Sequence, residues 1–131
     1  MDDFERILQL NPSFSQAHYQ RAKILAKEGE FEKADKELNQ VYGNILKEYK
    51  KDTVFIKSLK KSQKLWIQLR DAEMKVKFPD RERGYYGSVL PMCWSLYKTE
   101  LTIRRANELK VWINGVEEGD VCAGTVKIKA H

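Results

Sequence analysis

The chain has 131 residues, a size that accommodates one domain, or one small domain with an appendage. Its hydrophobic share of 42% is enough for a core, yet no apolar run approaches the roughly 20 residues that a membrane-spanning helix needs. Charged residues make up 33% with a net charge of +5, and only three prolines and seven glycines interrupt the chain, so long, well-solvated helices are favoured. We therefore expect an all-α protein, an antiparallel helical hairpin or small helix bundle with long helices and an irregular C-terminal tail.

Two short helices are predicted before residue 30. The first covers about residues 2–9 and stops before Asn11-Pro12, and the second begins at Ser13 or Ser15 and ends near Gly29. The opening stretch MDDFERILQLNP is acidic and amphipathic, without the basic start and apolar core of a signal peptide. We expect no export signal within this chain.

The next two helices are longer. The third begins at about Glu30, and its apolar positions alternate steps of three and four, which indicates a narrow seam facing a partner helix. Those positions are Phe31, Ala34, Leu38, Val41, Ile45 and Tyr49. Asp52 or Thr53 is expected to cap the fourth helix, which ends before Pro79. Its predicted inner stripe is Phe55, Leu59, Ser62, Trp66 and Leu69.

The segment PDRERGYYGSVLP, residues 79–91, is the only long predicted connection, so binding groups are expected here more than elsewhere. Tyr85 and Tyr86 lie between two glycines and are the strongest candidates for contact with a partner; the alternative is that both pack back onto the helices.

A fifth helix is predicted from Pro91 or Met92 to Asn114, stopped by Gly115. Its predicted inner stripe is Trp94, Tyr97, Leu101, Leu109 and Trp112. The TVKIKA tail alternates like a short strand, or is disordered.

Charged residues of the fourth and fifth helices are spaced so that they can link the two helices. Glu100 and Arg104 are one turn apart, as are Arg105 and Glu108. Arg70 and Glu100 are predicted to form a buried pair that fixes the register, with the nearby Trp66 in the core rather than at a binding hot spot. We interpret the set as a structural network: Trp66, Arg70, Glu100 and Arg104. Asp71 and Glu73 are a weaker candidate, an acidic pair for recognition of a partner.

Seven lysines lie from Lys47 to Lys64, against Glu48 and Asp52. This cluster could meet phosphates, but it lacks the arginines and interleaved aromatics of nucleic-acid readers, so a solvated face is favoured and nucleic-acid binding is not expected.

The cysteines and histidines of the sequence form no pattern typical of a catalytic site. Cys93 and Cys122 are the only cysteines, and the sequence leaves open one disulfide or two free thiols, without zinc spacing. The only histidines, His18 and His131, are far from the other motifs. We therefore predict no enzyme, no cofactor and no metal site.

Residues 10–34, LNPSFSQAHYQRAKILAKEGEFEKA, resemble most of a tetratricopeptide repeat. The Asn-Pro boundary, the small residues of the first helix and the Gly29–Phe31 turn fall at repeat-like spacing, although Arg21 stands at a position that is normally apolar. The resemblance implies a helix pair over residues 1–30 that either docks on the following helices or belongs to a longer array.

Residues 34–122 resemble the LprI-like lysozyme-inhibitor family. Three motifs carry this resemblance in order: ADKELNQVY from Ala34, QKLWIQLRDAEM from Gln63 and TELTIRRANELKVWI from Thr99. It implies a small, helical, bacterial and usually exported domain over residues 31–122, followed by a tail at 123–131. Met74 and Tyr97 stand where the family has cysteines, so a family disulfide is absent here and export to the periplasm or beyond is in doubt.

The same resemblance implies a protein partner, a lysozyme or another cell-wall glycosidase, whose cleft the 84–89 loop would block with Asp71 and Glu73 as supports. Many lysozymes are basic, and a net charge of +5 would slow association with such a target. The first alternative is a tetratricopeptide-type scaffold that holds a partner peptide in a groove. A weaker alternative is contact with an anion or nucleic acid through the lysines of residues 47–64.

Overall fold

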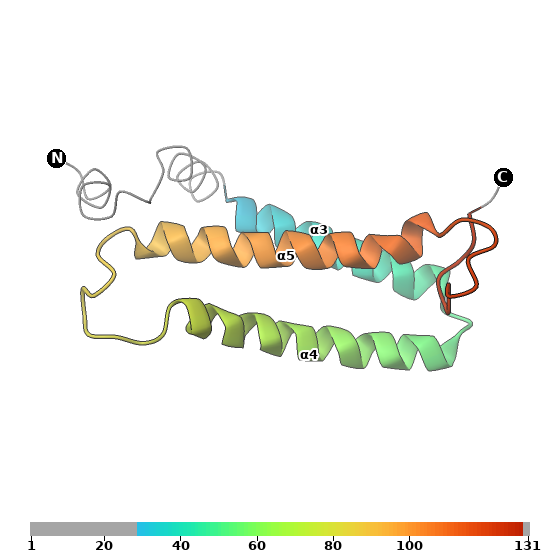
Figure 1. Cartoon of the computed structure of the whole chain (residues 1–131), viewed down its shortest axis with the longest axis horizontal. Coiled ribbons are helices and arrows are strands. Elements are labelled where there is room, and N and C mark those ends of the chain that lie inside the picture. Colours follow the sequence, from blue (N-terminus) through green and yellow to red (C-terminus); the bar gives the residue numbers. More distant parts are fainter. Residues whose placement is uncertain (1–28, 130–131) are drawn as a thin grey trace.

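The computed structural model describes residues 29–129, and within them the chain forms three long helices. Helix α3 covers Glu30–Glu48, α4 covers Thr53–Lys77 and α5 covers Leu90–Asn114. In Figure 1, α4 runs opposite to α3 and α5, so that the described part is an up-down-up bundle. The expected all-α class and these three helices are confirmed. The helices predicted at 2–9 and 13–29 lie outside the described residues.

The ends of the helices follow local chemistry. Asp52 caps α4, because its Oδ1 accepts a hydrogen bond of 3.1 Å from the Phe55 backbone N–H. Pro91 lies in the first turn of α5, where a missing N–H does no harm. Gly115 ends α5 with a φ of 80°, a backbone conformation that glycine adopts without strain. The predicted Asp52 cap and the Gly115 stop are thus confirmed.

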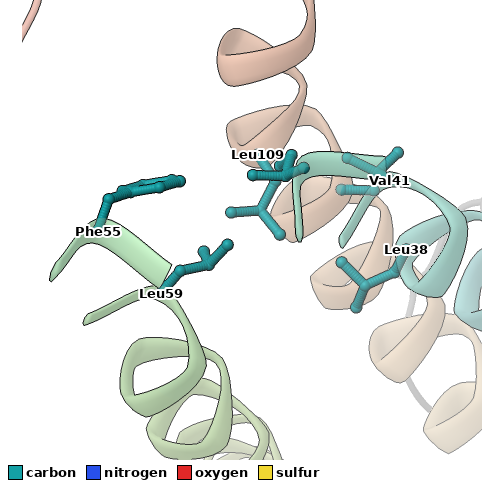
Figure 2. Packing of buried hydrophobic residues seen from close by; sticks show 7 residues of the cluster. Leu38, Val41, Phe55, Leu59 and Leu109 are labelled. Atoms are coloured by element: carbon teal, nitrogen blue, oxygen red, sulfur yellow. The ribbon is translucent and has the colours of Figure 1, made fainter. Parts of the chain in front are cut away.

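The main core lies where all three helices meet. In Figure 2, Phe55 and Leu59 of α4 and Leu38 and Val41 of α3 surround Leu109 of α5. On α3 the buried positions Ala34, Leu38, Val41 and Ile45 belong to the predicted seam.

Helices α3 and α5 approach more closely than α4 and α5. Small side chains of α5 make this approach feasible: Thr99 and Thr102 are fully buried and Ala106 is 1% exposed. Thr102 satisfies its hydroxyl by donating a 2.8 Å hydrogen bond to the Lys98 carbonyl oxygen. The α3–α5 pair is therefore the tightly packed part of the described bundle.

Two predicted inner stripes need correction. Leu69 was expected in the core but is 56% exposed, and Ser62 is also exposed, whereas Gln63 and Met74 are buried. The buried face of α4 is turned toward Gln63 because Arg105 of α5 engages its side-chain oxygen.

On α5, the fully buried residues are Leu96, Thr99, Thr102, Ala106 and Leu109. Four of the five predicted residues of its inner stripe, namely Trp94, Tyr97, Leu101 and Trp112, are only half-buried. Helix α5 packs on both α3 and α4. Because it packs more closely on α3, its most deeply buried face is the one toward α3.

The tail after α5 folds back without forming a strand. Val116 and Ile128 form one isolated parallel bridge, with the Val116 N–H donating to the Lys127 carbonyl at 2.9 Å and the Lys129 N–H donating to the Val116 carbonyl at 2.8 Å. The Trp112 indole N–H also donates a 3.0 Å hydrogen bond to Thr125 Oγ1. As far as residue 129, the TVKIKA segment is neither a regular strand nor disordered. None of the helices in the described part combines the length and hydropathy needed to cross a bilayer.

Candidate protein-binding surface

The connection between α4 and α5, residues 78–89, forms a loop at one end of the bundle (Figure 1). It encloses a hollow of about 280 Å³ with the adjoining ends of the two helices. The side chains around this hollow are mainly aromatic or charged, and they include Lys75, Phe78, Arg81, Arg83, Tyr85, Tyr86 and Trp94. This is the connection in which sequence reasoning placed the binding groups.

Phe78 organises the loop, although nothing in the sequence analysis singled it out. Its ring contacts Tyr86 edge-on with centroids 5.8 Å apart, Trp94 at 6.1 Å and Tyr97 edge-on at 6.4 Å. The signal available in the sequence was an aromatic residue directly before Pro79, at the end of a helix. The cluster joins the end of α4 to the first eight residues of α5.

Tyr85 and Tyr86 lie differently in the loop, and contact of either with a partner stays a prediction. Tyr86 turns inward, and its hydroxyl donates a 2.6 Å hydrogen bond to the Pro79 carbonyl oxygen. Tyr85 points outward with 65% of its surface exposed, while its ring rests edge-on against Tyr86 at 5.0 Å. The loop thus presents one exposed tyrosine on an anchored neighbour.

Cationic groups lie over the aromatic rings around the loop. The Lys77 ammonium lies 4.2 Å from the centre of the Tyr97 ring, and the Arg81 guanidinium carbon lies 5.6 Å from that of Tyr85. Lys75 forms a 2.6 Å ion pair with Asp80. Because that pair neutralises Asp80, the charges left at the tip are Arg81, Glu82 and Arg83, and the tip is basic.

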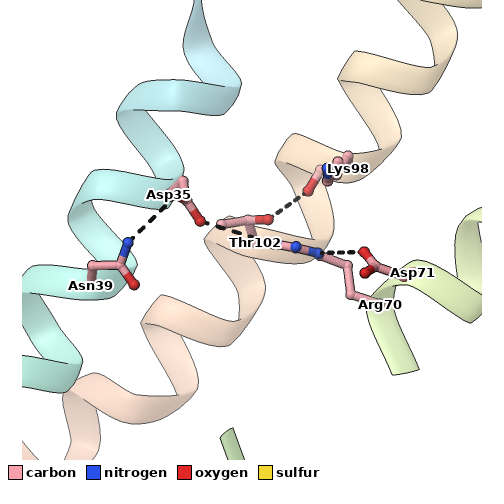
Figure 3. Close-up of polar contacts among 6 residues, drawn as sticks. All are labelled: Asp35, Asn39, Arg70, Asp71, Lys98 and Thr102. Carbon is pink, nitrogen blue, oxygen red and sulfur yellow. Dashed lines mark hydrogen bonds and ion pairs between the residues drawn. The ribbon is translucent and has the colours of Figure 1, made fainter. Parts of the chain in front are cut away.

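Arg70, which was predicted to belong to a structural network with Trp66, contacts acidic residues on two helices. Arg70 reaches from α4 toward Asp35 of α3, 3.9 Å away, and also pairs with Asp71 at 3.4 Å (Figure 3). Its guanidinium carbon lies 5.2 Å from the centre of the Trp66 ring, and its side chain is only 10% exposed. Arg70 therefore links α4 to α3. Pairing between Arg70 and Glu100 stays a prediction.

Arg105 provides the matching link between α5 and α4. It donates hydrogen bonds to the Gln63 side-chain oxygen at 3.0 Å and to Ser62 Oγ at 3.1 Å, and it forms the predicted one-turn ion pair with Glu108 at 3.7 Å. Its guanidinium also lies near the Trp66 ring, 5.9 Å from the centre. Gln63 was missed by sequence reasoning because an uncharged amide on a helix gives no charge-pairing signal.

Comparison with known proteins identifies the family. A family model described as lysozyme inhibitor LprI matches residues 15–109, which is more than half of the chain. The chain belongs to the LprI family. The match begins before residue 34, where the motifs of the resemblance start, and so includes part of the tetratricopeptide-like segment.

A second comparison concerns a shorter stretch. Over 38 residues this LprI-family chain is 74% identical to the tetratricopeptide repeat and J domain-containing co-chaperone DNJ1 of Cryptococcus neoformans. That stretch is 29% of this chain and 7% of the co-chaperone, so the chain spans a small part of that relative. Because the match is short, it supports the tetratricopeptide-like repeat only weakly. The relative is fungal, and a bacterial origin of this chain has no support from it. No solved structure matches the chain.

The remaining predicted residues lie away from the loop. Asp71 is exposed and pairs with Arg70, and Glu73 borders a hollow between α4 and α5, so neither acid lines the loop hollow. Arg104 is exposed and borders the same α4–α5 hollow as Glu73. In the part of the chain that the structure describes, no group of three or more His, Cys, Asp or Glu side chains is placed to hold a metal ion.

The cysteines of this LprI-family member are not bridged. Cys93 is half-buried at the beginning of α5 and Cys122 is exposed in the tail that follows α5, and both are free. Burial raises the pKa of the Cys93 thiol, and the nearby Lys77 ammonium offsets part of this effect. Met74, which the resemblance in the sequence places at a family cysteine position, is 1% exposed, so its side chain contributes packing.

Proposed function

We propose that the chain is a non-catalytic protein-binding module that blocks the cleft of a lysozyme-type glycosidase with its 78–89 loop. Membership of the LprI family supports a lysozyme-inhibitor-like domain. The observation that carries the assignment to this loop is the position of Tyr85, which is 65% exposed on a loop whose neighbouring Tyr86 is anchored.

The chemistry of the loop tip suits such a cleft. Glycosidases of this type place a pair of carboxyl groups on either side of the scissile bond. Arg81 and Arg83 would approach those carboxylates, and the Tyr85 ring would occupy space otherwise taken by a sugar. Tyrosine and arginine are also the side chains enriched at binding hot spots.

The loop is well prepared for insertion. The Tyr86–Pro79 hydrogen bond and the three ring contacts of Phe78 hold its conformation before any partner is present. A loop that is ordered in advance loses less conformational entropy on binding, which favours affinity.

The test is the lysis of bacterial cell walls by a lysozyme in the presence of increasing amounts of the chain. We expect inhibition at micromolar concentrations, and an inhibition constant at least about tenfold higher for Tyr85→Ala, since a hot-spot side chain is removed. Val121→Ala is the matched control, because Val121 is 97% exposed in the tail. Absence of inhibition by the unmodified chain, or equal inhibition by Tyr85→Ala, would refute the proposal.

Salt dependence separates two kinds of target. The net charge of +5 repels a basic lysozyme at long range, so added salt should speed association with such a target. With an acidic glycosidase the association rate should fall as salt is added. Stopped-flow measurements over a range of ionic strength would distinguish the two.

A second candidate function rests on the co-chaperone match. The 74% identity over 38 residues supports a tetratricopeptide-type adaptor that holds a partner peptide. Deleting residues 1–29 should then abolish capture of the peptide and leave inhibition by the 78–89 loop intact. Retained capture by the shortened chain would count against the adaptor.

A further inference from the structure

Helix α4 lies at one edge of the described bundle, and its outer face is exposed over most of its length (Figure 1). At about 100° per residue, four lysines of its first half fall within about 100° around the helix axis. They lie on the side opposite the buried Phe55 and Leu59. We call them together the α4 lysine row, and its members, all exposed, are Lys57, Lys60, Lys61 and Lys64.

The charge of the α4 lysine row is not balanced by acidic side chains. Residues 53–69 contain no aspartate or glutamate, and no lysine of the row forms an ion pair in the part of the chain that the structure describes. The acids that precede the row are engaged elsewhere, because Glu48 pairs with Lys127 and Asp52 caps α4. Asp71, which follows the row, pairs with Arg70. The row is therefore free to attract an anionic partner.

Aliphatic side chains border the row on both sides. Val54 and Leu65 are 76% and 54% exposed, and they lie about 20–40° around the helix from Lys61. On the other side Ile67 is 42% exposed and lies about 20° from Lys60. A ligand that covers this face thus meets positive charge along its middle and apolar groups at both edges.

An anionic lipid bilayer offers both kinds of contact. Lysine ammonium groups reach the phosphate level while their apolar stems and the neighbouring aliphatic side chains enter the boundary with the acyl chains. Clusters of four or more lysines on a helix are typical of binding to acidic lipids. A nucleic acid suits the face less well, since the exposed residues of 53–69 include no arginine or aromatic side chain for contact with bases.

We propose that the outer face of α4 binds an anionic lipid surface, with the first half of the helix lying along that surface. The lysine row would contact the headgroup phosphates, and Val54, Leu65 and Ile67 would enter the bilayer to a shallow depth. About 20 Å of helix separates Lys64 from the end of α4, where the 78–89 loop begins. The lipid surface and a protein partner of the loop could therefore be bound at the same time.

The proposal is tested by sedimentation of the full chain with lipid vesicles. One set contains phosphatidylcholine alone, and the other contains phosphatidylcholine with about 30% phosphatidylserine. We expect the chain to sediment with the anionic vesicles only, and the bound fraction to fall as salt is added. Absence of binding to the anionic vesicles, or equal binding to both sets, would overturn the proposal.

The decisive variant is Lys60→Gln/Lys64→Gln. Each lysine close to an anionic surface strengthens binding roughly fivefold, so the partition coefficient should fall at least about tenfold. Lys33→Gln/Lys36→Gln is the matched control, because it removes the same charge from exposed positions of α3. We expect it to change the partition coefficient less than about threefold. Equal weakening by the two variants would mean that net charge, and not the row, attracts the vesicles, and would overturn the proposal.

Leu65→Ser distinguishes a bilayer from other polyanions. Because a leucine that enters the bilayer is lost, we expect its partition coefficient to fall at least about threefold, whereas Val121→Ser in the tail should bind like the unmodified chain. Unchanged vesicle binding by Leu65→Ser would overturn the proposal. So would tighter binding to a single-stranded oligonucleotide than to the vesicles, since the row would then serve a nucleic acid. Tyr85→Ala should bind the vesicles normally, which separates this face from the 78–89 loop.

Discussion

The Tyr49 hydroxyl donates a 2.7 Å hydrogen bond to the Trp112 carbonyl oxygen and so joins the end of α3 to the end of α5. The same oxygen accepts a 3.1 Å hydrogen bond from the Lys127 backbone N–H in the tail. One hydroxyl thus connects three segments. Because Tyr49→Phe leaves both partners without this group, we expect the free energy of unfolding to fall by about 1–2 kcal/mol in urea denaturation.

Tyr42→Phe is the control for this change. Tyr42 packs against the same core, and its hydroxyl makes no hydrogen bond to another residue within 29–129. Its replacement should change stability by less than about 0.5 kcal/mol. Equal effects of the two substitutions would mean that the Tyr49 hydroxyl contributes nothing specific.

Two glycines should respond to alanine in opposite directions. At Gly115 the backbone φ is 80°, and an added Cβ would lie 2.9 Å from the Lys127 carbonyl oxygen, so Gly115→Ala should destabilise the chain by about 1–2 kcal/mol. At Gly43, inside α3, an added Cβ meets nothing within 4 Å, so Gly43→Ala should stabilise it by about 0.5–1 kcal/mol. Thermal unfolding of both variants measures the difference, and the same sign for both would contradict this account.

Met74 provides packing near the end of α4. Its side chain is 1% exposed, so Met74→Ala should lower the free energy of unfolding by about 2–5 kcal/mol through lost contacts and a cavity. Val76→Ala is the control on the same helix, because Val76 is 73% exposed and should change stability by less than about 0.5 kcal/mol. A loss below 1 kcal/mol for Met74→Ala would mean that the site collapses around the smaller side chain.

Sequence reasoning worked where one local rule decides the outcome. The spacing of Ala34, Leu38, Val41 and Ile45 predicted the buried face of α3, because that helix packs mainly on α5 along a single seam. Asp52 and Gly115 were identifiable because a cap and a stop depend on their own side chain and backbone.

The predictions from the sequence were wrong for a helix that packs on two neighbours and for a helix face that no other helix covers. Trp94, Tyr97, Leu101 and Trp112 of α5 are only half-buried, and no periodicity shows which of two apolar faces of a helix is buried more deeply. Leu69 has the periodicity of a core residue, yet it lies on the side of α4 that α5 leaves open. The partners of Arg70 depend on the relative position of helices far apart in the sequence, which helical spacing alone does not encode.

At the candidate site, too, the sequence alone does not determine how the side chains of the loop pack. Sequence composition indicated residues 79–91 as the long connection, and the structure has this connection at residues 78–89. It left open which tyrosine faces outward, since that depends on the Tyr86–Pro79 hydrogen bond and on the ring of Phe78. An anchored tyrosine next to an exposed one is a result of tertiary packing.

The two free cysteines should differ in reactivity and in their effect on stability. Burial raises the pKa of the Cys93 thiol above its ordinary value of 9.0, whereas Cys122 is exposed, so at neutral pH Cys122 should react with iodoacetamide at least about tenfold faster. The unfolded chain loses the Cys93 proton at a lower pH than the folded chain does. The resulting stabilisation is therefore fully present below pH 9.0 and is lost as pH rises through the folded pKa.

Urea denaturation between pH 8 and 11 tests this dependence. Cys93→Ala should make stability fall less steeply over that range than in the unmodified chain, because the alanine has no proton to lose. Cys122→Ser should leave the slope unchanged, since that thiol is exposed in the tail. A slope that both substitutions alter equally, or alkylation of Cys93 as fast as of Cys122, would show that the thiol at the beginning of α5 is open to solvent.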